Sequence, residues 1–117
     1  YIIHYTLYHY TLYIIHYTLY IMMKYLLPVL RRHSNVAVYG CGHIHNFQYI
    51  KKPGDPIVYW VNSAAALSRK VSATDGTQWC DPSTGFTIIS ADKQQLTLSA
   101  INKDGKILYQ LPIKKTK

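Results

Sequence analysis

The fold is decided by the stretch VAVYGCGHIHN, residues 36–46. Its first four residues are small and β-forming, which predicts a short buried strand at 36–39. A turn with two glycines and two histidines follows. If the backbone stays extended there, alternate side chains face the same way, so His43 and His45 point to one side. Neutral imidazole is the commonest protein metal ligand, so the pair predicts a metal site. The alternative is two surface histidines after a strand, because His-x-His is a short pattern.

Outward from this loop, the sequence predicts a helix before it and strands after it. Apolar residues recur at helical spacing from Met22 to Leu30, and basic residues at 31–33 suit the last turn of a helix. Pro28 either kinks this helix or marks its start. A turn is expected at 51–56 and a long loop at 67–83. Strands are expected at 47–50, 57–61, 85–91, 95–101 and 106–113, the last three forming an antiparallel meander with hairpin turns.

The first 21 residues differ from the rest. The octamer YIIHYTLY occurs at 1–8 and again at 13–20, and no charged residue precedes Lys24. Repeated Tyr, His and Thr fit hydrocarbon poorly, so no membrane span is expected. A signal peptide is not visible either, because the basic start and the cleavage site are missing. We therefore divide the chain into a low-complexity repeat at 1–21 and a domain portion at 22–117.

The charge balance is strongly positive. Thirteen Lys and Arg residues face five acidic ones, which gives a formal net charge of +8. Such a balance favours anionic partners. The basic residues are spread along the chain as single residues and pairs, without the dense block typical of a nucleic-acid-binding arm, so no nucleic acid is expected. The two cysteines, Cys41 and Cys80, are compatible with one disulfide or with two free thiols.

The order of these parts resembles the C-terminal portion of the calcineurin-like metallophosphoesterases. More closely, it looks like the type 5 tartrate-resistant or purple acid phosphatases. Residues 26–30 leading into 39–49 are similar to that family's helix, strand and last metal motif, and 58–65 to its next strand and small-residue turn. The resemblance implies an α/β (α+β) fold, the C-terminal part of a four-layer sandwich with one helix and mostly antiparallel strands.

The resemblance also implies the chemistry. In that family a dinuclear metal centre, of iron with iron, zinc or manganese, hydrolyses phosphate monoesters. His43 would bind the divalent metal and His45 the ferric ion. Asn46 would orient these imidazoles without binding a metal itself. The resemblance further implies a secreted or lysosomal location.

The remaining ligands of such a centre are not visible in the sequence. The family's upstream Asp, Asp-Tyr, Asn-His and His motifs are missing, no acidic residue precedes Asp55, and Gly54-Asp55-Pro56 is interpreted as a turn. Two imidazoles alone do not hold a metal pair, which needs a bridging carboxylate.

We therefore predict a fragment of a metal-dependent acid phosphatase, with an incompletely assembled centre, no residue assigned as catalytic, and little activity as this chain. The alternative is a non-enzymatic, basic, β-rich module that binds anionic partners. Half of a sandwich exposes an apolar sheet face, so self-association through that face is also expected.

Overall fold

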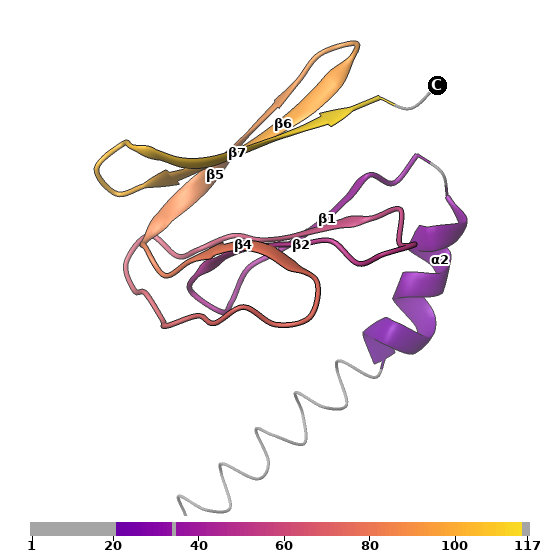
Figure 1. The fold of residues 1–117 in the computed structure, drawn as a ribbon, viewed down its shortest axis with the longest axis horizontal. Coiled ribbons are helices and arrows are strands. Elements are labelled where there is room, and N and C mark those ends of the chain that lie inside the picture. The colour runs from indigo at the N-terminus through magenta and orange to yellow at the C-terminus, as the bar shows by residue number, and fades with distance from the viewer. Residues whose placement is uncertain (1–20, 34, 116–117) are drawn as a thin grey trace, which may run out of the picture. The chain divides into compact units, whose positions relative to one another are not determined.

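The computed structural model of the chain describes residues 21–33 and 35–115 (Figure 1). They belong to two compact units that divide between Val36 and Ala37, and each unit is described by itself. The tyrosine- and histidine-rich repeat at 1–20 lies outside the described residues. The predicted domain boundary next to it therefore stays a prediction.

The first unit contains a short helical segment in two parts. η1 (Met22–Leu26) is a π-helical turn, and α2 (Leu27–Arg32) is an α-helix. Pro28 lies in the first turn of α2, directly after η1, so it lies inside a continuous helical segment where the helix changes from π to α. It marks the start of α2 but not the start of the helical segment. The described residues contain no helix long and apolar enough to cross a membrane.

The first sheet of the second unit has four strands in the order β1-β3-β2-β4. These strands are β1 (Val38–Cys41), β2 (Phe47–Ile50), β3 (Val58–Val61) and β4 (Thr77–Asp81). β1 and β3 run parallel, whereas β2 runs antiparallel to both of its neighbours. The carboxyl ends of β1 and β3 therefore lie side by side, and the segments that follow these two strands meet at one edge of the sheet.

The second sheet is the predicted antiparallel meander. It consists of β5 (Gly85–Ala91), β6 (Gln95–Asn102) and β7 (Ile107–Lys114), in that order. The turn between β5 and β6 is closed by Asp92, whose Oδ1 accepts hydrogen bonds from the N–H groups of Gln94 (2.6 Å) and Gln95 (2.8 Å). This is the usual way an aspartate stabilises a tight turn.

The core of the second unit lies between its two sheets, which form separate layers in Figure 1. Phe47 and Trp60 from the first sheet meet Leu98 and Ala100 from the second, and all four are buried. Aromatic rings extend this core: Trp79 stacks on Tyr109 with ring centroids 4.7 Å apart. One helical segment and seven strands in two mostly antiparallel sheets, among the described residues, form an α+β fold. The predicted fold class is therefore confirmed.

Two sequence predictions about the strands are wrong. The predicted loop at 67–83 contains a strand, β4, because Thr77–Asp81 pairs with β2 and places Trp79 in the aromatic core. The first strand starts two residues later than the predicted Val36, since its extent is set by pairing with β3 from Val38 to Cys41. Gly40 and Cys41, expected in the turn, therefore belong to the strand.

Candidate functional site

The candidate site is the His43–His45 loop, the segment between β1 and β2 (residues 42–46). Two backbone hydrogen bonds hold it. The N–H of Asn62, just after β3, donates to the carbonyl of Cys41 (2.8 Å), and the N–H of Arg69 donates to the carbonyl of His45 (2.9 Å). The loop is therefore fixed by the chain that follows β3, because the parallel pairing of β1 and β3 brings both segments to one edge.

The backbone of the loop is not extended, contrary to the sequence prediction. His43 has φ 81° and His45 has φ 64°, both in the left-handed region that few residues other than glycine adopt. The turn is therefore made at the histidines themselves and not at Gly40 or Gly42, neither of which has a positive φ. Strain of this kind, about 1–3 kcal/mol for each residue, persists where the surrounding structure enforces it and is concentrated at functional sites.

The two imidazoles have different surroundings. His43 is exposed, whereas His45 is half-buried. The Nδ1 atom of His45 is buried and has no hydrogen-bond partner. Buried polar atoms are nearly always paired, so this nitrogen is an exception among the described side chains.

Asn46 was predicted to orient the imidazoles. Its side chain is almost fully buried, with 1% exposed, and its Oδ1 accepts a hydrogen bond from Nε2 of Gln48 (2.9 Å). This contact ties Asn46 to Gln48 in the following strand, β2. Its predicted role behind the metal ligands stays a prediction.

The described residues do not fit a dinuclear metal centre. Within residues 21–33 and 35–115, no group of three or more His, Cys, Asp or Glu side chains could hold a metal ion. The first aspartate after the loop, Asp55, lies in the predicted turn, where its carboxylate accepts hydrogen bonds from nearby residues. It is buried, and its carboxylate accepts from the N–H of Ile57 (3.0 Å) and from the hydroxyl of Tyr59 (2.7 Å). Within the described part of the chain, no bridging carboxylate is therefore supplied beside the two histidines.

Both cysteines are free thiols, which decides between the two predicted alternatives. Cys41 lies at the end of β1, directly before the histidine loop. Burial of its thiol raises the pKa above the ordinary value of 9.0, although part of the residue is exposed. A thiol with a raised pKa is a poor nucleophile at neutral pH, so Cys41 is not a candidate for covalent catalysis.

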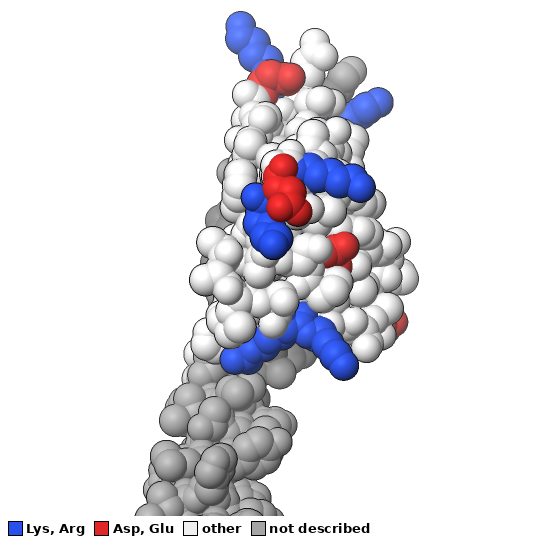
Figure 2. Space-filling view, turned by 90° about the vertical axis from the view of Figure 1, so that its left-hand side faces the viewer, with Lys and Arg blue, Asp and Glu red and all other residues white. Residues whose placement is uncertain are grey.

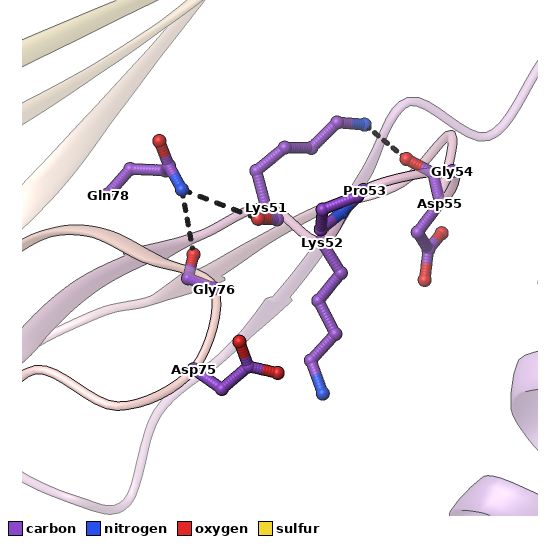
Figure 3. Close-up of a pocket in the computed structure, with 8 residues that line it drawn as sticks. All are labelled: Lys51, Lys52, Pro53, Gly54, Asp55, Asp75, Gly76 and Gln78. Carbon is purple, nitrogen blue, oxygen red and sulfur yellow. Dashed lines mark hydrogen bonds between the residues drawn. The ribbon is translucent and has the colours of Figure 1, made fainter.

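A pocket of about 500 Å³ lies in another part of the sheet, near the turn at 51–56 (Figure 3). It is lined by two lysines, two aspartates, a glutamine and three further turn residues: Lys51, Lys52, Pro53, Gly54, Asp55, Asp75, Gly76 and Gln78. The ammonium of Lys51 already donates to the carbonyl of Asp55 (2.6 Å). The two lysines and two aspartates cancel in formal charge, so the pocket is not a concentrated anion site.

The positive charge of the chain is also dispersed at its surface. On the face in Figure 2, lysine, arginine and aspartate side chains alternate over the surface without forming one large basic area. On this face the positive charge is therefore diffuse, which favours anions in general without selecting one.

Sequence reasoning missed the residues that fix the loop. Asn62 not only bonds to Cys41 but also accepts, at its Oδ1, a hydrogen bond from the hydroxyl of Thr87 (2.7 Å). That hydroxyl accepts in turn from Nε1 of Trp60 (2.8 Å). The chain of bonds connects the two sheets next to the loop. The feature of the sequence that could have pointed to this role is the position of Asn62, a polar residue directly after the apolar strand β3.

No protein-family model and no curated protein sequence matches the chain. Among solved structures, it is similar to "GAP50 the anchor in the inner membrane complex of Plasmodium", with a TM-score of 0.72 and 19% sequence identity. The match covers 82% of this chain and 30% of that chain, so this chain spans less than a third of the protein it resembles. At this identity the likeness concerns the fold alone.

These comparisons contradict the family assignment made from the sequence. The prediction that the chain is the C-terminal part of a calcineurin-like metallophosphoesterase, of the type 5 purple acid phosphatases, is wrong: no family model or curated protein supports it, and the solved structure it resembles is named as an anchor. A short histidine motif and an order of elements do not establish a family, and a fold does not define a function. The comparisons assign a fold to this chain and no family.

Proposed function

We propose that the chain contributes His43 and His45 to metal-dependent hydrolysis of phosphate monoesters, and that the described residues do not catalyse it alone. One observation carries the proposal: the buried, unpartnered Nδ1 of His45 in a loop where both histidines are left-handed. Leaving a buried polar atom unpaired costs about 1–3 kcal/mol, which binding of a metal ion would offset. The net charge of +8 supports an anionic substrate. The other ligands would come from outside the described residues.

The test measures metal binding and turnover separately, on the full chain. Calorimetric titration with Zn²⁺ should give binding that His43→Ala and His45→Ala each weaken by about tenfold or more, as expected when one of two imidazole ligands is lost. His33→Ala is the matched control, since His33 is exposed and belongs to the first unit. Turnover of p-nitrophenyl phosphate should stay at background in every variant.

Two results would count against this proposal. Zn²⁺ binding that is unchanged in the double variant of His43 and His45 would refute the metal site. Strong turnover by the wild-type chain, abolished in His43→Ala, would refute the statement that the described residues are inactive alone.

A second candidate is a non-enzymatic basic module that binds anionic partners. It is supported by the diffuse positive charge and by the likeness to GAP50, which is named as an anchor in a membrane complex. Binding to vesicles containing phosphatidylserine should then fall steeply with added salt, because surface charges are screened over about 8–10 Å at physiological ionic strength. The histidine double variant should bind equally well. Loss of vesicle binding in that variant would favour the first candidate.

A further inference from the structure

The two outer edges of the β5-β6-β7 sheet are built differently. The β7 edge carries Pro112, which has no N–H, and it ends in Lys114. A register irregularity also occurs where β6 pairs with β7, between Ala100 and Ile101. Proline, lysine and bulges are the features that keep an edge strand from pairing with another chain. β5 has none of them: its seven residues, Gly85–Ala91, include no charged residue and no proline.

The free hydrogen-bonding groups of β5 follow from its register. At its two ends, the N–H of Asp92 donates to Gln95 (3.0 Å) and the N–H of Lys103 donates to Thr84 (3.1 Å). Bonding alternates along an antiparallel pair, so the even-numbered residues of β5 bond to β6. The odd-numbered ones, from Thr87 to Ala91, direct N–H and C=O to the outer edge. Among the described residues no strand pairs with that edge.

The side chains of β5 are also apolar and exposed. Phe86 is 49% exposed, Ile88 45% and Ile89 65%. Because side chains alternate along a strand, Phe86 and Ile88 share one face and Ile89 lies on the other. Thr87, next to Ile88, bonds to Trp60 in the other sheet, so Phe86 and Ile88 lie on the face turned away from the core. The edge thus offers both free backbone groups and apolar surface.

We propose that β5 pairs antiparallel with β5 of a second copy of this chain, across a two-fold axis at Ile88. The charge distribution favours a second copy of the chain as the partner. A chain with a net charge of +8 repels a second copy wherever its lysines gather, and β5 is an uncharged seven-residue strand where two copies approach without that repulsion. Across a two-fold axis, the same strand of both copies meets, so β5 pairs with β5 and no second surface is needed.

The register of this pairing is set by the outward-facing groups. With the axis at Ile88, Thr87 of one copy lies opposite Ile89 of the other, and both direct their N–H and C=O to the shared edge. Ile88 then lies opposite its own counterpart in a non-hydrogen-bonded pair, where side chains are closest. One strand pair is smaller than a standard interface, so we expect a dissociation constant on the order of 10–100 μM. The proposal is independent of the proposed function.

The test is sedimentation velocity of the full chain at concentrations below and well above that constant. Two substitutions should break the pairing. Ile88→Lys places like charges opposite each other at the axis. Ile89→Pro removes an outward N–H while leaving the bonds to β6 intact. Each should weaken dimerisation by about tenfold or more, the equivalent of losing two backbone hydrogen bonds. Ile107→Lys is the control: Ile107 is 50% exposed, on β7.

The expected result is a dimer that forms in the wild-type chain and in Ile107→Lys but not in the two β5 variants. Since every variant retains residues 1–20, differences between them report on the strand edges alone. A dimer that survives both β5 substitutions, or is lost equally in Ile107→Lys, would overturn the proposal. A wild-type chain that stays monomeric would overturn it too.

Discussion

Gly85 provides the sharpest test of how the second sheet is packed. It is buried at the start of β5, where that strand lies against the backbone of β6. A Cβ atom at this position would overlap the carbonyl oxygen of Ile101 and lie 2.9 Å from the Cα of Asn102. Both obstacles are backbone atoms, which unlike a flexible side chain cannot rotate away. Gly85→Ala therefore requires β5 and β6 to separate at this end.

The expected cost has two parts. Overpacking of this kind destabilises by about 1–3 kcal/mol. Separation of the strands also weakens the hydrogen bonds from Gly85 to Ala64 and from Lys103 to Thr84, both 3.1 Å, at about 0.5–1.5 kcal/mol each. We therefore expect Gly85→Ala to lower the free energy of unfolding by about 2–6 kcal/mol, a large part of the roughly 5–15 kcal/mol that stabilises a typical domain.

Urea unfolding followed by tryptophan fluorescence measures this change, because Trp60 and Trp79 both lie in the core. Gly40→Ala is the matched control. Gly40 also lies in a strand, but a Cβ there meets nothing within 4 Å and its φ is not positive. That variant should stay within about 0.5 kcal/mol of the wild type. If the two alanine variants unfold at the same urea concentration, the close approach of β5 to β6 is incorrect.

Three further predictions concern single side chains. Thr87→Val keeps the shape but leaves Trp60 and Asn62 without their shared partner, so urea unfolding should show a loss of about 1–3 kcal/mol. Asp92 has a pKa below its ordinary 3.8 because two backbone N–H groups bond to it, so its contribution is present above that pH and lost as the pH falls through the lowered pKa. The melting temperature should therefore fall more steeply in acid for the wild type than for Asp92→Asn. Alkylation of Cys41 by iodoacetamide should rise with pH to a midpoint above 9.0.

Each of these has a control elsewhere in the chain. Thr97→Val, on β6, should cost less than Thr87→Val, because the Thr97 hydroxyl takes part only in a long 3.4 Å bond from Gln95. Asp104→Asn, which removes a carboxylate from the other hairpin turn, is the control for Asp92→Asn. Mass spectrometry of a Cys80→Ala variant isolates the alkylation of Cys41. Equal losses of stability in the two valine variants would contradict the argument for Thr87. An equally steep fall of the melting temperature in acid for Asp92→Asn and the wild type would contradict the argument for Asp92. An alkylation midpoint at or below pH 9.0 would contradict the argument for Cys41.

The meander was predictable because its determinants are local. Alternating side chains and turn-forming residues lie within a few positions of one another, and β5 is found at the predicted residues. Pro28 likewise acts through its own backbone and lies where η1 changes to α2. β4 was missed for the opposite reason: Thr77–Asp81 becomes a strand by pairing with β2, which is distant in sequence. No local pattern reports such a pairing.

The sequence located the histidine loop but not its conformation, and the role of its two histidines as metal ligands stays a prediction. The spacing of His43 and His45 was enough to mark the loop, and the two residues do lie between consecutive strands of one sheet. Their left-handed backbone and the unpartnered nitrogen of His45 were not predictable, because bonds from Asn62 and Arg69 hold the loop in place. The family assignment went further than the motif allowed, since a short pattern carries little information.

The sequence by itself determined the meander, the excess of positive charge and the position of the histidine loop, whereas the α+β class was inferred from a family resemblance. These depend on periodicity, turn chemistry and residue counts, which are properties of neighbouring residues. Only the tertiary structure decided the parallel pairing of β1 with β3, the strand at Thr77–Asp81, the direction of the histidines and the unprotected edge of β5. Each of these depends on which distant segments meet, and that is settled by burying Phe47, Trp60 and their neighbours between two sheets.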